Sequence, residues 1–383
     1  RIKSSFWGQL STEEMYTFYL KMTNEFRAYT YFPPSLIKTD KDMRFDINEM
    51  VFDNFYMDVK NVFDMPVDIR LGRQDFLGTY GEGFLIMDGT PQDGSRTFYF
   101  NALKAAWRMN ETNGLDFVYI RNTRDEEYLP VINEDKAPQN LNTTDEEAYV
   151  LYWKNKDKEN LPFEAYYIYK REDDESGRGL QGEKGIINTM GGFGKYIFDP
   201  WTLRGQMAGQ FGSYGEEDRQ GMGGYLYLDK DFKEMTWTPK ASLGYMYLSG
   251  DDVDSAENEA WDPLFSRYPW ISELYVLSMG RDTGVTGYWT NLMAWRLETT
   301  FKTSEKTKLL LAYNYLRAAE ETATTTILSG DSLDRGHLFQ TRFDYAFTKN
   351  ITAYLLVDYL LPGDFYVDDD SMLFTRVELQ VKF

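Results

Sequence analysis

The stretch Met372-Leu-Phe-Thr-Arg-Val-Glu-Leu-Gln-Val-Lys-Phe383 alternates strictly between two kinds of residue. Leu373, Val377 and Leu379 fall on one face of an extended chain, whereas Arg376 and Glu378 fall on the other. About ten residues with this period are the length of one tilted β-strand that crosses a lipid bilayer. A half-buried strand of a soluble protein alternates in the same way, so the rest of the chain must decide between the two.

Segments of the same kind recur along the chain and are separated by polar or turn-forming residues. Sixteen candidates lie at roughly 15–32, 46–60, 66–76, 97–109, 115–123, 147–155, 162–172, 185–198, 201–213, 219–229, 236–249, 285–302, 306–318, 336–347, 350–361 and 372–383. Short connections such as 199–200 alternate with long ones such as 124–146 and 250–284. This alternation is typical of an outer-membrane barrel, which has short periplasmic turns and long extracellular loops.

We therefore predict an all-β fold, a transmembrane antiparallel up-and-down β-barrel of a bacterial outer membrane. It comprises the single domain 1–383 and has sixteen strands, or eighteen if 250–284 contains a further hairpin. Residues 1–14 are expected to form a short N-terminal periplasmic or plug segment. The surroundings would then be outer-membrane lipids and lipopolysaccharide. A soluble β-sandwich or β-helix is the alternative fold.

The composition narrows the classes of function. Aromatic residues make up 17% of the chain, and no apolar run approaches the eighteen residues of a transmembrane helix. Because the chain has no cysteine, disulfides, iron–sulfur ligation and CxxCH haem attachment are excluded. A net charge of −20 argues against nucleic acid as a partner.

The charged residues of the segments identify the face of each strand that points into the lumen. Leu297 alternates with Arg296 and Glu298, and an Arg or Lys that faces lipid at mid-depth costs about 2–4 kcal/mol. The charged face must therefore line the pore. The predicted pore-lining cations are Arg27, Arg70, Arg73, Lys104, Arg108, Lys170, Arg204, Arg296, Arg317, Arg342 and Arg376. Arg73 is in phase only if Gly72 forms a β-bulge.

These cations have two interpretations. They can form a track that lowers the barrier for an anionic solute. Alternatively, Arg296–Glu298, Arg342–Asp344 and Arg376–Glu378 can belong to a paired network that stiffens the wall. The long connections together carry more negative charge than the whole chain, so the strands are slightly basic.

The acidic connections suggest one metal site. Asp251, Asp252 and Asp254, with Glu257 nearby, offer the hard oxygen ligands that Ca²⁺ prefers. The alternative is a solvated acidic loop tip. Apart from this calcium site on the extracellular loops, no cofactor is predicted.

Two stretches resemble the alginate-export family of outer-membrane barrels. One is Ile69-Arg-Leu-Gly-Arg-Gln-Asp-Phe76, followed by Tyr80-Gly-Glu-Gly83 and Arg96-Thr-Phe98. The other contains Ser249-Gly-Asp251 and then Trp261-Asp-Pro-Leu-Phe265. The resemblance implies a monomeric barrel of sixteen to eighteen strands that passes an anionic polysaccharide or small solutes. It does not imply alginate here, because the predicted lumen mixes Arg with Asp and Glu.

No catalytic constellation is visible, and the chain is not expected to be an enzyme. The single histidine, His337, alternates with apolar residues and is predicted on the lipid-facing side. A barrel of sixteen strands leaves an aqueous channel, here narrowed by inward loops including 77–96. The predicted function is passive diffusion of small, anionic solutes. The alternatives are export of an anionic polysaccharide or oligosaccharide such as alginate, and a loop-plugged structural or adhesive surface barrel.

Overall fold

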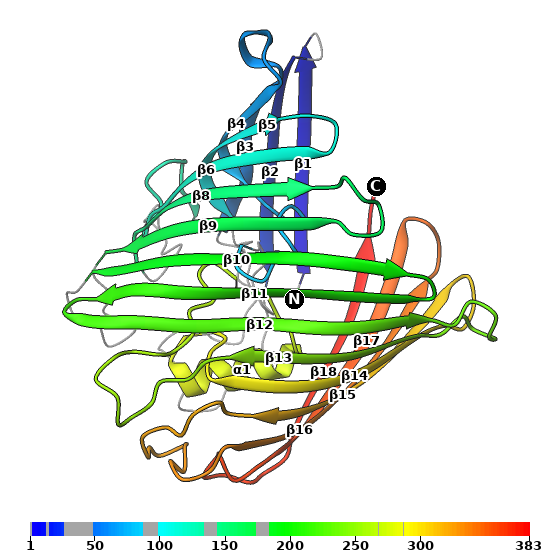
Figure 1. The fold of residues 1–383 in the computed structure, drawn as a ribbon. Helices are drawn as coiled ribbons and strands as arrows, with labels where there is room; N and C mark the ends of the chain where they lie inside the picture. Colours follow the sequence, from blue (N-terminus) through cyan, green and yellow to red (C-terminus); the bar gives the residue numbers. More distant parts are fainter. Residues whose placement is uncertain are drawn as a thin grey trace.

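The computed structural model describes residues 2–12, 15–26, 49–86, 99–133, 144–173, 184–266, 268–285 and 287–383. They form one curved, highly twisted sheet with little helix (Figure 1). The strands are β1 (Ile2–Thr12), β2 (Tyr16–Phe26), β3 (Glu49–Val59), β4 (Val67–Gln74), β5 (Phe100–Arg108), β6 (Asn113–Asn122), β7 (Ile132–Asn133), β8 (Glu146–Asn155), β9 (Phe163–Glu172), β10 (Gly185–Phe198), β11 (Trp201–Tyr214), β12 (Glu217–Asp231), β13 (Lys240–Leu248), β14 (Leu292–Lys302), β15 (Thr307–Arg317), β16 (Asp334–Ala346), β17 (Ile351–Pro362) and β18 (Met372–Val381). The helices are the 3₁₀ turn η2 (Val62–Asp64) and α1 (Glu273–Thr283).

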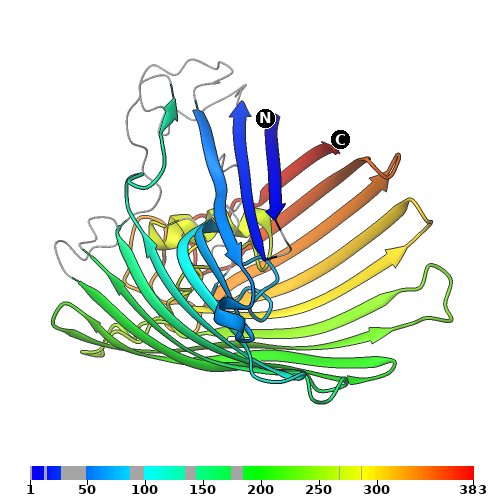
Figure 2. The same cartoon turned by 90° about the horizontal axis from the view of Figure 1, so that it is seen from above.

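The strands pair in chain order, each antiparallel to the next, as the up-and-down prediction requires. The exception is the two-residue β7, which pairs only with the start of β3, so β6 pairs directly with β8. Among the described residues, seventeen strands therefore make the meander, and no ladder between its two edges, β1 and β18, is observed there. Seen from above, the sheet curves around α1, which lies on its inner side (Figure 2).

Alternation sorts the side chains between the two faces of the sheet. On β14, Leu297 points outward and is 54% exposed, whereas Arg296 points inward and is only 8% exposed. On β17, Leu355 is exposed on the outer face and Asp358 is fully buried on the inner one. Apolar residues outside and polar residues inside are the reverse of the distribution in a soluble globular protein. This distribution is typical of a membrane barrel with an apolar belt and a polar interior. The predicted lumen phase is confirmed on these strands.

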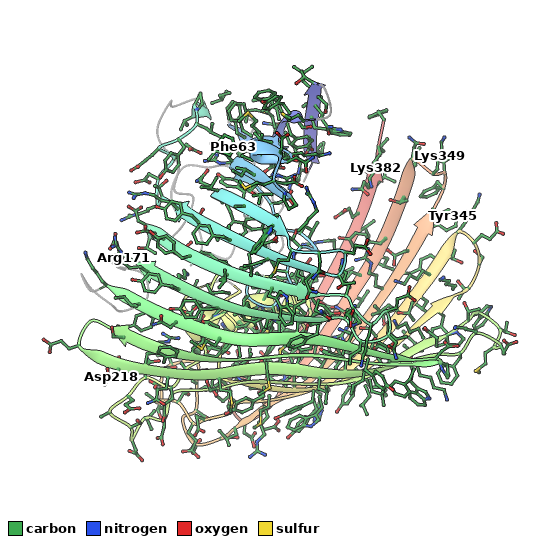
Figure 3. All side chains as sticks on the ribbon, turned by 45° about the horizontal axis from the view of Figure 1, so that its top comes forward. Phe63, Arg171, Asp218, Tyr345, Lys349 and Lys382 are labelled. Atoms are coloured by element: carbon green, nitrogen blue, oxygen red, sulfur yellow. The ribbon has the colours of Figure 1, made fainter. Side chains whose placement is uncertain are left out.

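The two ends of the sheet differ. One end has only short turns, whereas the other has the long connections together with the two-residue turn between β11 and β12. Tyr345 and Lys349 mark the short-turn end in Figure 3, whereas Arg171 and Asp218 mark the opposite end. In bacterial barrels the short turns are periplasmic. This assignment gives the molecule its orientation in the membrane.

Three expectations about the boundaries need correction. Within the segment 1–14, expected to be a periplasmic or plug segment, Ile2–Thr12 instead forms β1, which is in register with β2 over its whole length. The strand expected at 285–302 begins only at Leu292, and 250–284 contains helix α1 rather than a hairpin. In the part of the chain that the structure describes, neither helix is long and apolar enough to cross a membrane.

Candidate pore and vestibule

Two connections fold into the interior of the sheet and meet there. We call residues 75–86, from the connection after β4, the first inward loop, and residues 249–291, between β13 and β14, the second inward loop. The Phe265 amide donates to the Leu85 carbonyl at 3.0 Å, and Ser266 Oγ donates to the Gly83 carbonyl at 2.7 Å. The inward course predicted for 77–96 is thus confirmed for 77–86, and 87–96 lies outside the described residues.

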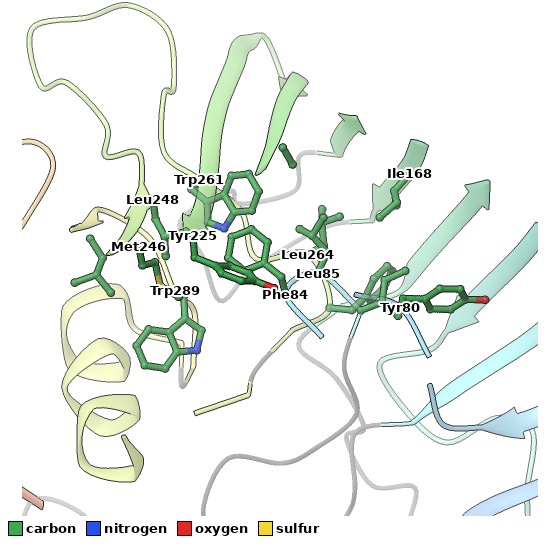
Figure 4. Packing of buried hydrophobic residues seen from close by; sticks show 14 of the residues in the cluster. Tyr80, Phe84, Leu85, Ile168, Tyr225, Met246, Leu248, Trp261, Leu264 and Trp289 are labelled. Carbon is green, nitrogen blue, oxygen red and sulfur yellow. The ribbon is translucent and has the colours of Figure 1, made fainter. Parts of the chain in front are cut away.

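Aromatic side chains make up much of the contact between these loops and the wall. The Phe84 ring stacks on Trp261 with ring centres 5.3 Å apart and meets Tyr225 of β12 edge-on, also at 5.3 Å (Figure 4). Trp261 lies directly against β12, where a Cβ on Gly223 would come within 2.6 Å of its ring. The apolar cluster of loops and wall is therefore packed as tightly as a globular core.

Helix α1 is fixed to the wall at both of its ends. The Ser272 side chain caps the helix by accepting from the Tyr275 amide at 2.9 Å, and Glu273 pairs with Arg376 of β18 at 3.0 Å. In the last turn, Asp282 pairs with the buried guanidinium of Arg335 on β16. The helix is thus held against β16–β18 by charged groups as well as by its apolar face.

Other buried ions hold the second inward loop to the opposite wall. Lys170 of β9 is fully buried, pairs with Glu146 at 2.8 Å and with Glu172, and donates to the Leu264 carbonyl at 3.2 Å. Asp262 of the loop accepts hydrogen bonds from Tyr214 at 2.8 Å and from Tyr288 at 2.9 Å. Because these groups are inaccessible to water, they fasten the loop and do not line an open path.

A large cavity opens below the two loops, toward the short-turn end. Its volume is about 1250 Å³, and we call it the vestibule. Eight cationic and five acidic side chains line it, an excess of three positive charges in a chain of net charge −20. The cations are Lys195, Arg204, Lys233, Lys240, Arg296, Lys302, Lys308 and Arg342, and the acids are Glu82, Asp229, Asp231, Glu273 and Glu298.

The vestibule contains cations of both kinds that the sequence suggests, those paired within the wall and those available to a solute. Arg296 pairs with Glu298 at 2.7 Å, and Arg342 pairs with Asp344 at 2.7 Å, so these residues belong to a wall network. Lys302 and Lys308 instead face each other across β14 and β15. Neither lysine makes an ion pair with any residue that the structure describes. Two like charges placed opposite each other are unfavourable for the sheet, which points to a role in the pore.

Three of the predicted pore-lining residues, Arg204, Arg296 and Arg342, line the vestibule. Four lysines of the lining are not among the predicted pore residues, although each lies in a predicted strand: Lys195, Lys240, Lys302 and Lys308. Lys302 is in phase with Arg296, six residues earlier, so alternation alone could have found it. Glu82 had no such signal, because its position depends on how the first inward loop folds.

Five further predicted cations lie on the inner face but outside the vestibule. Arg70 pairs with Asp58 at 2.6 Å, Lys104 with Asp116 at 3.2 Å, and Arg108 with Asp68. Lys170 and Arg376 contact the second inward loop, as described above. Arg376 pairs there with Glu273, whereas the wall-network interpretation paired it with Glu378, whose carboxylate accepts from Tyr354 at 2.9 Å. These five residues therefore brace the wall or the loops.

The remaining three predicted pore-lining residues do not line the pore that the structure describes. Arg73 follows Gly72, which has a positive φ of 123° but causes no shift of register, so Arg73 shares the outward phase of Leu71. A register shift between Leu316 and Arg317 ends the regular ladder, and Arg317 is exposed in the phase of the outer face. Arg27 lies outside the described residues.

Arg73 instead forms a buried pair with Glu126 in the connection after β6. The two side chains are 1% and 7% exposed, and their shortest separation is 2.6 Å. Burial alone would raise the pKa of Glu126. The hydrogen bonds and charge of Arg73 outweigh burial and hold this pKa below its ordinary value of 4.5.

The lowered pKa of Glu126 predicts a pH-dependent contribution to stability. It is fully present above pH 4.5 and is lost as the pH falls through the depressed pKa. We expect Glu126→Gln to lower the free energy of unfolding at neutral pH and to have a smaller effect well below pH 4.5. Urea unfolding of both proteins in detergent micelles at the two pH values measures this difference. A deficit that does not change with pH would show that the carboxylate charge is not involved.

The predicted calcium ligands are not brought together. Asp251 accepts from the Glu259 amide at 2.9 Å, and Asp252 accepts from the Asp254 amide at 2.9 Å, so two of the carboxylates stabilise turns. Among the described residues, the acidic group whose oxygens do converge is Asp368–Asp370, which is exposed. The prediction placed the ligands by their spacing in the sequence, and the turns direct them apart.

Comparison with protein families identifies the relatives of this chain. The family model for alginate export matches residues 21–379. The chain belongs to the alginate export family. A comparison with curated proteins finds no match.

Two solved structures from pseudomonads have a similar fold. The chain is similar to a BenF-like porin from Pseudomonas fluorescens, with 9% identity and a TM-score of 0.54 over 98% of this chain and 91% of that one. It is also similar to OccK3 (OpdO) of Pseudomonas aeruginosa, with 9% identity and a TM-score of 0.52 over 99% and 93% of the two chains. At this identity the likeness concerns the fold alone.

Family and fold together establish this member of the alginate export family as a channel-forming β-barrel of the bacterial outer membrane. Its surroundings are membrane lipids, and what passes it is a small solute or a polysaccharide.

Proposed function

We propose that the barrel is a passive diffusion channel for small anionic solutes. The observation that carries this proposal is the charge of the vestibule, which has three more cations than acids inside a strongly acidic protein. Rings of Arg and Lys lower the barrier for anions in other pores. Lys302 and Lys308, at the short-turn end, are the cations best placed to meet a solute, because both are exposed and neither pairs with an acidic residue in the part of the chain that the structure describes.

Reversal potentials in a KCl gradient across a planar lipid bilayer test this function. We expect the wild-type channel to be anion-selective. The double variant Lys302→Glu/Lys308→Glu changes the lining from a balance of +3 to −1 and should move the reversal potential to the cation-selective side. Lys156→Glu/Lys158→Glu is the matched control, because these exposed lysines in the turn after β8 do not line the vestibule.

The same experiment separates the competing functions. A cation-selective wild-type channel would contradict the proposal, as would equal shifts in the two double variants. No current in any condition would instead support a loop-plugged structural or adhesive barrel.

Export of an anionic polysaccharide is the second candidate, because the family that the chain belongs to is described by alginate export. The cationic vestibule is at the periplasmic end, where an exported chain would enter. Block of the current by uronate oligomers added on the short-turn side, with little block by chloride-sized anions, would favour this function over diffusion of small solutes.

A further inference from the structure

The carboxylate of Glu82 is bound by a cluster of hydrogen-bond donors where the first inward loop borders the vestibule. Glu82 belongs to the first inward loop, within Tyr80-Gly-Glu-Gly83. Gly81 and Gly83 have φ values of 53° and 81°, a left-handed conformation that glycine adopts readily. A Cβ on Gly81 would also lie 2.7 Å from Oε1 of Gln206 on β11. The two glycines thus let the loop approach the wall with Glu82 between them.

Three consecutive strands supply the partners of this carboxylate. One oxygen of Glu82 accepts from the guanidinium of Arg204 on β11 and from the Tyr225 hydroxyl on β12, the latter at 3.1 Å. The other oxygen lies 3.5 Å from Nζ of Lys195 on β10. Two cations and a hydroxyl around one carboxylate are the groups that recognise such an anion through charge-assisted hydrogen bonds.

Glu82 can leave these partners without displacing the rest of the loop. Its side chain is 22% exposed and lines the vestibule, so water and solutes reach it. The neighbouring backbone is held separately: the Gly81 amide donates to Glu164 at 2.8 Å, and the Gly83 carbonyl accepts from Ser266 at 2.7 Å. Arg204 keeps Asp229 as a partner at 3.0 Å and would present the remainder of its guanidinium to a new anion.

We propose that Lys195, Arg204 and Tyr225 form a binding site for the carboxylate group of a solute, and that Glu82 occupies this site as an internal competitor. An incoming carboxylate replaces the hydrogen bonds that Glu82 gives up, and the displaced carboxylate of Glu82 is hydrated in the vestibule that it lines. The inference rests on the proposed function, since it names carboxylates as the class of anion that the vestibule selects.

Equilibrium binding of trifluoroacetate, followed by the broadening of its fluorine NMR line on detergent-solubilised protein, tests the site. Glu82→Gln keeps the shape of the side chain but removes its charge, and we expect it to lower the half-saturating concentration about tenfold, because a charge-assisted bond is replaced by a neutral one. Glu82→Ala removes the competitor altogether and should bind at least as tightly.

Two further variants distinguish a site from a general effect of charge. Glu298→Gln removes another acid of the same vestibule, one bound to Arg296 on the wall, and should leave the half-saturating concentration within about twofold of the wild type. Adding Arg204→Gln to Glu82→Gln should abolish the gain in affinity.

Equal gains from Glu82→Gln and Glu298→Gln would overturn the proposal, as would a gain that survives the loss of Arg204 or no gain in either Glu82 variant. Because the measurement needs no current, its result is independent of the conductance test. A channel that fails to conduct anions while Glu82→Gln binds trifluoroacetate more tightly would refute the proposed function and leave this site standing.

Discussion

Replacing Lys170 by Met is expected to lower the free energy of unfolding by about 3–5 kcal/mol, because it removes one partner of a buried ionic cluster. The ammonium group of Lys170 is fully buried between Glu146 and Glu172, which are themselves 1% exposed. It also lies 4.6 Å from the centre of the Phe265 ring. Met fills a similar volume but leaves two buried carboxylates without their common counter-charge.

The control lies at the next position of the same strand. Arg171 points outward, is 38% exposed and pairs with Asp173 at 3.1 Å. Arg171→Met should change the stability by no more than about 1 kcal/mol, because exposed ion pairs contribute little. Urea unfolding of the three proteins, followed by tryptophan fluorescence in micelles, gives the comparison.

A compensating variant separates lost charge from lost packing. If unpaired carboxylates cause the instability, adding Glu146→Gln and Glu172→Gln to Lys170→Met should restore much of it. A triple variant as unstable as Lys170→Met alone, or an effect of Arg171→Met as large as that of Lys170→Met, would contradict the electrostatic explanation.

Residues whose side chains alternate over a whole strand could be placed from sequence. The apolar neighbours of Arg296 and Arg342 must face lipid, so the two arginines must face the lumen. This argument uses only the residues of one strand and can be applied to each strand by itself. It fails for two of the predicted cations. The placement of Arg73 required a β-bulge at Gly72, and the ladders on both sides of β4 show no register shift there. Arg317 has the phase of Leu311 on β15, which is exposed on the outer face.

Elements whose structure depends on distant contacts could not be placed in this way. In β1, Phe6 and Trp7 are adjacent and both more than half exposed, so the segment lacks a clear two-residue period. In α1, Leu274, Tyr275 and Val276 are consecutive and all buried, whereas the exposed side of the helix carries Leu277 and Arg281. Because buried residues occupy most of the circumference and an apolar residue is exposed, the helical periodicity that would reveal the element is weak.

The vestibule combines residues that alternation predicts with a residue whose position depends on distant contacts. All of its cations except Lys233 come from strands, where alternation predicts their face, whereas Glu82 reaches them only because the first inward loop packs on Tyr225 and on the second inward loop. A contact between residues 82 and 204 crosses more than a hundred positions of the chain. The local sequence pattern cannot predict this contact. The charge balance of the pore could therefore be determined only from the structure.

Removing the second inward loop is expected to raise the single-channel conductance severalfold. The loop fills the interior above the vestibule with large buried side chains, including Trp261, Phe265, Tyr275 and Trp289. A barrel of this size without such a filling holds a wide aqueous channel. Leu248 and Leu292 are register partners on β13 and β14, so a two-residue Asn-Gly turn can replace residues 249–291 and close the hairpin without distorting it.

A shorter replacement in the same connection is the matched control. Residues 252–257 form a tip that is exposed over its whole length, and the Glu259 amide donates to Asp251 at 2.9 Å, which brings the two ends of the tip together. Replacing 252–257 by Gly-Gly should leave the conductance unchanged, because the tip lies outside the apolar cluster. If the large replacement conducts no better than the wild type while the barrel remains folded, the first inward loop must set the constriction alone. If both replacements raise the conductance equally, then the exposed tip, and not the buried aromatic filling, limits the flow of ions.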